Sequence, residues 1–176
     1  NTTIQTVTYS VYPPQLTSLS PSQIWLGLKN SDDTGTKFDL LAEVYRNGTL
    51  IGSSQTNDVP GGGSGFNNAV LRTINLGLAS PVGILPGDSL SIRLSVRIAA
   101  SSGHRNGTAR LWYNDASANS VFGATIQGAA SSYYLRNSFV LGTTPGTGPK
   151  STIDVSVDRN VSGNAFKPFG TWTYIF

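Results

Sequence analysis

The sequence contains no cysteine and no methionine, and it has only one histidine among 176 residues. The absence of cysteine excludes disulfides, thiolate nucleophiles and zinc–thiolate sites. One histidine excludes multi-histidine metal sites and most pairs of a nucleophile with a histidine base. This histidine, His104, lies in a loop-like stretch of Ser, Gly and Asn with no evident catalytic partner. The chain therefore offers few residues for catalysis.

Charge is also scarce, because charged residues make up 12% of the chain and the formal net charge is only +3. No run of basic residues occurs, so the sequence predicts no nucleic-acid partner. No apolar stretch approaches the ~20 residues that cross a bilayer, so no membrane span is expected. The nine acidic residues offer no evident glycosidase pair, and no Gly-x-Ser-x-Gly elbow leads from a strand into a helix. We therefore expect a protein that is not an enzyme.

Alternation of apolar and polar residues is the main pattern that is present. It is clearest over Ser89–Ile98 and recurs over Lys37–Arg46, and each stretch places its apolar residues on one face of a strand. Asn47-Gly48 predicts a two-residue hairpin turn between Lys37–Arg46 and residues 49–54, because a type I′ turn needs positive φ at both central positions. Helical spacing is not sustained anywhere in the sequence.

Further candidate strands follow the same pattern. They cover residues 3–12, 23–29, 69–78, 108–113, 133–141, 153–158 and 170–176. About ten short strands with Gly/Pro turns, and no helix that could cover a parallel sheet, predict an all-β fold. The expected architecture is a two-layer antiparallel β-sandwich with jelly-roll or Greek-key connections. We expect residues 13–176 to form this domain and residues 1–12 to form a separate N-terminal strand.

The N-terminal strand is a candidate donor strand. Val7, Tyr9 and Val11 share one face, Thr and Ser occupy the other, and Pro13-Pro14 ends the strand. Such a strand either pairs within its own subunit or inserts into a neighbour, where it supplies backbone hydrogen bonds and fills pockets. Insertion into a neighbour is a head-to-tail contact, and it grows into a filament.

Four sequons provide candidate glycosylation sites at Asn1, Asn47, Asn106 and Asn160, although a chain rich in Asn, Ser and Thr produces some by chance. The start at Asn1 without any methionine suggests that an N-terminal segment was removed, and secretion is the simplest cause. A secreted protein without cysteine is more typical of prokaryotic surfaces than of animal secretions. We expect an extracellular or cell-surface location.

A candidate carbohydrate site consists of Trp112, Asn114 and Asp115. By strand parity Leu111 and Tyr113 share one face, so Trp112 points outward if Leu111 is in the core. An outward aromatic face can stack on a sugar ring while polar neighbours bind its hydroxyls. The alternative is that Trp112 packs in the core or against the second sheet.

Adjacent carboxylates make Asp32 and Asp33 weak candidates for calcium ligands. Asp39 or backbone carbonyls would complete the oxygen shell. The spacing is not that of an EF-hand, and the alternative is a turn in which these side chains bond local backbone groups. A second oxygen cluster, Asp115 with Asn119, has the same two interpretations. No metal or other cofactor is therefore predicted.

Four segments carry a resemblance to known proteins: IWLGLKNSDD (24–33), GGSGFNN (62–68), GTARLWYND (107–115) and FKPFGTW (166–172). They resemble secreted β-sandwich proteins of environmental prokaryotes whose role is uncharacterised. In its terminal strand and its composition the chain is also similar to subunits of pilus-like or thread-like extracellular filaments that are joined by donor-strand exchange. The second resemblance implies a partner strand, and neither implies a catalytic residue.

These observations predict a secreted structural protein that polymerises with itself, head to tail, into an extracellular filament or an adhesive surface matrix. The alternative is an extracellular carbohydrate-binding module whose partners are glycans. A hydrolase ranks third, because it would need an acidic residue that the sequence does not single out.

Overall fold

The computed structural model describes residues 3–4, 13–159 and 164–176. These residues form twelve β-strands and three short 3-10 helices, without an α-helix. The expected all-β class is confirmed, whereas the expected count of about ten strands is too low. In this part of the chain no helix has the length and apolar character needed to cross a membrane.

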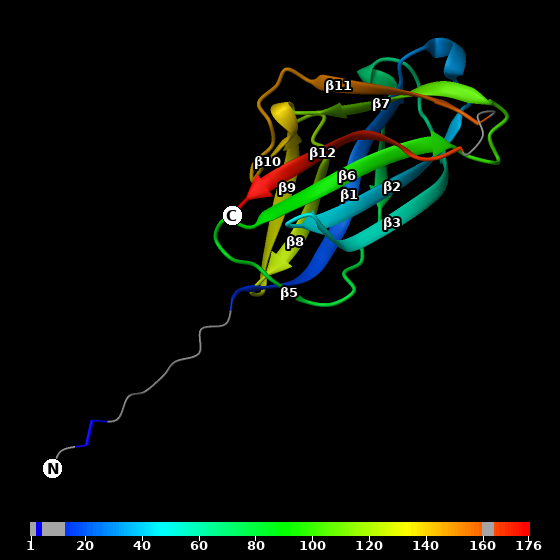
Figure 1. Cartoon of the computed structure of the whole chain (residues 1–176). Helices are drawn as coiled ribbons and strands as arrows, with labels where there is room; N and C mark the ends of the chain where they lie inside the picture. The colour runs from blue at the N-terminus through cyan, green and yellow to red at the C-terminus, as the bar shows by residue number, and fades with distance from the viewer. Residues whose placement is uncertain (1–2, 5–12, 160–163) are drawn as a thin grey trace.

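The elements follow one another in the order shown in Figure 1. The strands are β1 (Gln15–Leu28), β2 (Lys37–Arg46), β3 (Thr49–Pro60), β4 (Val70–Ile74), β5 (Val82–Gly83), β6 (Ser89–Ile98), β7 (Asn106–Tyr113), β8 (Val121–Ile126), β9 (Ala129–Arg136), β10 (Val140–Gly142), β11 (Ser151–Asp158) and β12 (Lys167–Ile175). The 3-10 helices are η1 (Ser31–Asp33), η2 (Phe66–Asn68) and η3 (Asn137–Phe139).

Hydrogen bonds join all twelve strands into one mixed sheet. The strand order is β11-β7-β1-β8-β9-β10-β12-β6-β2-β3, and β4 and β5 both pair with β1. The strands pair antiparallel except β10 and β12, which run parallel. Because β11 and β3 end this order, each has one paired neighbour among the described strands.

Local sequence explains the β2–β3 hairpin. Asn47 and Gly48 adopt φ of 48° and 79°, as the predicted turn requires, and Arg46 pairs with Thr49 across it. In β2 from Phe38 to Val44, and in β6 from Leu90 to Ile98, every second residue is apolar and buried. These side chains form a continuous apolar surface on the inner face of this part of the sheet. The predicted hairpin and the predicted strand Ser89–Ile98 are therefore both confirmed.

Burial concentrates in one hydrophobic core. The core includes side chains from β2, β6 and β12 as well as from β1, β7, β8 and β9. Trp172 of β12 is fully buried, donates from Nε1 to the Arg136 carbonyl oxygen at 3.1 Å, and contacts the rings of Tyr113 and Phe139. Every buried hydrophobic residue lies between Leu16 and Trp172 in the sequence, so residues 13–176 contain the complete described core.

Two expected strands are interrupted, β1 begins well before the expected strand 23–29, β3 continues beyond the expected residue 54, and β8 lies outside every expected strand. The expected strand over residues 133–141 is divided into β9 and β10, because Ser138 and Phe139 in η3 take φ of 62° and 56°. Only Val70–Ile74 of the expected strand 69–78 pairs with β1. Short-range alternation marked the paired parts of both segments as strands, but it did not reveal where the ladder stops.

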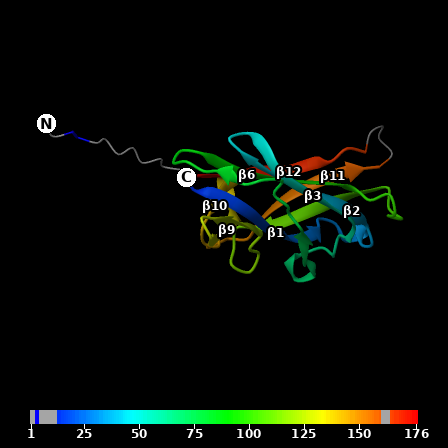
Figure 2. The same ribbon diagram turned by 90° about the horizontal axis from the view of Figure 1, so that it is seen from below.

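The start of β1 and the C-terminus lie at the same end of the molecule, as Figures 1 and 2 show. The segment before β6 holds both of them: Ile84 donates to the Pro14 carbonyl at 2.8 Å and Gly87 donates to the Phe176 carbonyl at 2.8 Å. The candidate donor residues Val7, Tyr9 and Val11, and the sequons at Asn1 and Asn160, lie outside the described residues.

Candidate functional sites

The first candidate site is the free edge of β3. Within the described ranges its backbone pairs only with β2. The five pairs from Gly52 to Thr56 are regular, and register shifts bound them on both sides. In an antiparallel ladder every second residue directs its N–H and C=O away from the partner strand. This edge therefore presents backbone donors and acceptors to a further strand.

β3 carries little of the chemistry that normally protects an edge. Proteins usually protect a sheet edge with charges, proline or a covering segment, because an exposed edge pairs with other chains. The only charged residue of Thr49–Pro60 is Asp58, whose carboxylate accepts a hydrogen bond from the Ser101 hydroxyl. Asp58 and Pro60 both lie at the end of the strand. The regular stretch before them is uncharged.

A hollow of about 420 Å³ opens beside the beginning of β3. Its lining contains no charged residue and consists of Leu50, Ile51, Gly52, Ser53, Gly77, Leu78 and Ala79. Residues 77–79 approach the strand so closely that a Cβ on Gly52 would lie 2.4 Å from the Gly77 carbonyl oxygen. Leu50 is 49% exposed, an apolar side chain at the rim. The hollow and the free edge together form a continuous site, which we call the β3 site.

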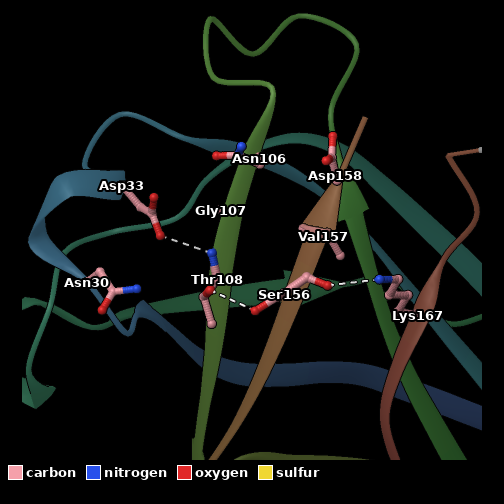
Figure 3. Close-up of a pocket in the computed structure, with 9 residues that line it drawn as sticks. All are labelled: Asn30, Asp33, Asn106, Gly107, Thr108, Ser156, Val157, Asp158 and Lys167. Carbon is pink, nitrogen blue, oxygen red and sulfur yellow. Dashed lines mark hydrogen bonds between the residues drawn. The ribbon is translucent and has the colours of Figure 1, made fainter. Parts of the chain in front are cut away.

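The second candidate site is a hollow of about 420 Å³ beside β11, drawn in Figure 3. Its lining includes three charged residues beside polar and apolar ones, and consists of Asn30, Asp33, Asn106, Gly107, Thr108, Ser156, Val157, Asp158 and Lys167. Asp33 accepts a hydrogen bond from the Thr108 N–H at 3.0 Å, and the Thr108 and Ser156 hydroxyls lie 3.0 Å apart. Lys167 donates from Nζ to the Ser156 carbonyl at 3.1 Å.

The contact of Lys167 places its ammonium group on the backbone of β11. Charges also lie along its outer face, where Asp154 accepts two hydrogen bonds from Arg110 of β7, at 2.7 and 3.0 Å. The hydrogen bond from Arg110 to Asp154 raises the pKa of the guanidinium. A strand adding to β11 would have to displace or desolvate these charged groups, and we call this region the β11 site.

The calcium candidates do not converge with Asp39. Asp32 is exposed in η1, and Asp33 bonds the backbone of β7. Asp39 is buried, pairs with Arg97 at 2.8 Å and accepts from the Asp58 N–H at 3.1 Å. Among the residues whose placement is described, no group of three or more His, Asp or Glu side chains could hold a metal ion.

Trp112 faces outward, as parity predicted, because Leu111 and Tyr113 are buried and Trp112 is half-buried. It lies opposite Trp25 in the β1–β7 register. The Phe66 ring lies between them, with its centroid 5.5 Å from that of Trp25 and 5.4 Å from that of Trp112. Through these ring contacts the 61–69 loop packs against the outer face of the sheet.

The polar residues of the carbohydrate candidate have partners within the protein. Asn114 is 8% exposed, donates to the Pro149 carbonyl at 3.2 Å and accepts from the Asn137 N–H at 3.2 Å. Asp115 accepts from the hydroxyl and the N–H of Ser117, and these hydrogen bonds lower the pKa of its carboxyl group. Sugar binding at Trp112, Asn114 and Asp115 stays a prediction.

The two described sequons differ in their surroundings. Asn47 is exposed, but its side chain donates to Asp88 at 2.9 Å and accepts from the Ser89 N–H at 2.8 Å. Asn106 is exposed at the rim of the β11 site, opposite Asp158 in the β7–β11 register. Glycosylation of either residue stays a prediction.

Sequence reasoning missed the β3 site and the partners of Trp112. The absence of charge before Asp58 was a readable signal, but the position of β3 at the end of the sheet depends on pairings between distant segments. Phe66 lies in a glycine-rich loop that showed no periodicity. Comparisons of the chain with family models, with curated proteins and with solved structures find no match.

Proposed function

We propose that this chain is a secreted structural subunit that assembles with copies of itself into an extracellular filament or surface matrix. In this proposal the N-terminal strand of one subunit inserts into the sheet of the next. Residues 13–176 would fold as a two-layer sandwich, antiparallel except for the β10–β12 pair, which the single core shared by β2, β6 and β12 with β1, β7, β8 and β9 supports. The observation that carries the proposal is the open sheet, whose main strand order ends in β11 and β3, each paired with a single strand among the described residues, as are β4 and β5 beside β1.

The N-terminal segment has the composition of a strand that pairs with such an edge. Residues 1–14 contain no charged residue, and Val7, Tyr9 and Val11 alternate with small polar residues. Ile4 is 88% exposed, so the described part of its own chain leaves it uncovered. Burying one such side chain stabilises an interface by about 1.5–3 kcal/mol. A neighbouring subunit could supply that burial.

Strand insertion between copies also accounts for the growth of a filament. A donor at one place on the surface and an acceptor at another make a heterologous contact, which produces an open filament unless the rotation between copies closes a ring. The low overall charge and the Ser/Thr-rich outer faces of the strands suit subunits that pack closely in a fibre or matrix outside the cell.

Electron microscopy at neutral pH tests the proposal on the full chain and on the chain lacking residues 1–12. The truncated chain should keep its fold, because the described core begins at Leu16, and thermal unfolding followed by circular dichroism checks this. Filaments from the full chain that vanish on truncation would support strand insertion. Monodisperse particles from both chains would overturn it.

A carbohydrate-binding module is the second candidate function, and the outward pair Trp25 and Trp112 favours it. Phe66 packs against both indoles, so a sugar ring would stack on the outer surface of this aromatic cluster. A module of this kind should remain monomeric and should lose its ligand on a glycan array when Trp112→Ala is introduced. A filament subunit should show no glycan binding that depends on Trp112.

A further inference from the structure

We infer that the β3 site is the acceptor for the N-terminal strand of the neighbouring subunit, with the strand added along Gly52–Thr56 and Tyr9 seated in the hollow beside Leu50 and Leu78. The inference rests on the proposed function and names the surface that the function uses. The alternatives are addition at β11 and pairing of the strand with its own subunit.

Charge favours β3 over β11. The incoming segment is uncharged, and so are the regular part of β3 and the lining of its hollow. At β11 the same segment would meet Lys167 on the Ser156 carbonyl, with Asp33 and Asp158 nearby. Burying charged groups without new partners is costly, so an uncharged strand gains more at β3.

The dimensions also fit. A strand of eight residues, the length of segment 5–12, would span about 26 Å at roughly 3.3 Å per residue, which is longer than the five regular pairs it would cover. Side chains two residues apart on a strand lie on the same face, so Val7 and Val11 would flank Tyr9 along the edge. A hollow of about 420 Å³ is within the size range of small-ligand pockets, roughly 300–1,000 Å³, and accommodates an aromatic side chain.

The path of β1 favours a neighbour over the same subunit. β1 runs antiparallel to the segment from β4 to β5, with Ser22 opposite Ile74 and Gln15 opposite Gly83. Residues 77–79 of the β3 site are therefore level with the middle of β1, downstream of where the chain enters it. To reach its own hollow the chain would have to reverse direction just before Pro13-Pro14, where proline favours extended backbone.

The natural absence of cysteine allows a direct test by cross-linking. Ser53 and Ser156 are a matched pair, because both are exposed serines that face outward and line hollows of equal volume on the two edge strands. Full-length chains carrying Thr8→Cys or Ser10→Cys, on the polar face of the donor, are mixed with full-length Ser53→Cys or Ser156→Cys and allowed to assemble. A disulfide forms only where the two Cα atoms come within about 4.4–6.8 Å.

The expected result is a cross-linked heterodimer with Ser53→Cys and at most a trace with Ser156→Cys, on a gel without reductant. Cross-linking to Ser156→Cys alone, or to neither position while truncation still abolishes filaments, would overturn the inference and leave the proposed function in place. An intramolecular disulfide in a chain carrying both Thr8→Cys and Ser53→Cys, formed in dilute monomer, would overturn transfer between subunits. A full chain that forms no filaments at all would overturn the proposed function itself.

Discussion

The two strands that end the main strand order, β11 and β3, each lie beside a hollow of about 420 Å³, yet their chemistry is opposite. At β11 a lysine bonds the strand's backbone, two carboxylates lie in the hollow, and an ion pair lies on the adjoining strand face. At β3 the hollow is uncharged and apolar side chains reach its rim. Hollows of equal volume therefore differ in the kind of segment they suit: the β3 hollow suits an uncharged strand and the β11 hollow does not.

In the proposed assembly, this difference between the two edges gives polymerisation a defined direction. Both edges have unpaired backbone groups, but an uncharged strand meets a desolvation penalty at one edge and an apolar hollow at the other. An edge covered by charges discourages pairing between chains, so β11 would not compete with β3 for the donor. One donor and one acceptor per subunit then produce a linear array.

The largest expected effect comes from filling the β3 hollow. Ala79→Trp places a large side chain in the space that Tyr9 would occupy, at an exposed position that leaves the core unchanged. We expect filaments to disappear in electron micrographs while the melting temperature stays within a few degrees of the original. Ala130→Trp is the matched control, since it fills a different hollow beside β9 and should assemble normally. Equal loss of filaments in both variants would count against a specific acceptor.

The two ion pairs nearest the edges should differ in their contribution to stability. Asp39 is buried and serves both Arg97 and the Asp58 N–H of β3, so Asp39→Ala should lower the free energy of unfolding by about 2–3 kcal/mol. Asp154 and Arg110 are partly exposed, so Asp154→Ala should cost less than about 1 kcal/mol. Urea denaturation measures both, and a larger loss for Asp154→Ala would contradict this ranking.

The turn that begins β3 should show a smaller effect. Asn47→Ala places at positive φ a residue that tolerates this conformation less well than Asn, and it removes the hydrogen bonds to Asp88 and Ser89, so we expect a loss of about 1–2 kcal/mol. Asn47→Gly keeps the turn conformation and loses only the hydrogen bonds, so it should recover part of the loss. If the two variants unfold at the same urea concentration, backbone conformation contributes little here.

The smallest expected effect is on acid stability. Hydrogen bonds from the Asn47 side chain and the Leu85 N–H, together with Arg46, hold the pKa of Asp88 below its usual range. The ionised carboxylate therefore stabilises the fold above the ordinary Asp pKa of about 3.9, and this stabilisation is lost as the pH falls through the lower folded value. Asp88→Asn should flatten the dependence of unfolding free energy on pH between about 5 and 2. An unchanged slope would show that Asp88 titrates as it does in the unfolded chain.

Asp115 provides the corresponding test near β11. Its hydrogen bonds from Ser117 also hold the pKa of the carboxyl group low, so Asp115→Asn should flatten the same acid limb. Comparing the two variants shows whether the loss of unfolding free energy in acid comes from carboxylates in both halves of the sheet or only from the half that carries β3.

Local pattern predicted the strands with clear alternation, but it missed β8 and the first half of β1. Alternation gave the bounds of Ser89–Ile98 and the outward position of Trp112, and Asn47-Gly48 gave the hairpin, because each depends on residues adjacent in the chain. Strand order could not be predicted, since the Trp25 and Trp112 pairing joins residues 87 positions apart. The candidate sites depend on the strand order. The charged residues of β11 and the uncharged stretch of β3 can be read in the sequence, but the sequence does not show that these two strands lie at the ends of the sheet.

Hydrogen exchange tests the central claim most directly, because it reads both edges in one sample. Outward amides of an unpaired edge exchange quickly, and pairing with a further strand slows them. In filaments of the full chain, compared with the chain lacking residues 1–12, we predict slowed exchange over Gly52–Thr56 and unchanged exchange over Ser151–Asp158. Slowed exchange at β11 with no change at β3 would contradict the account.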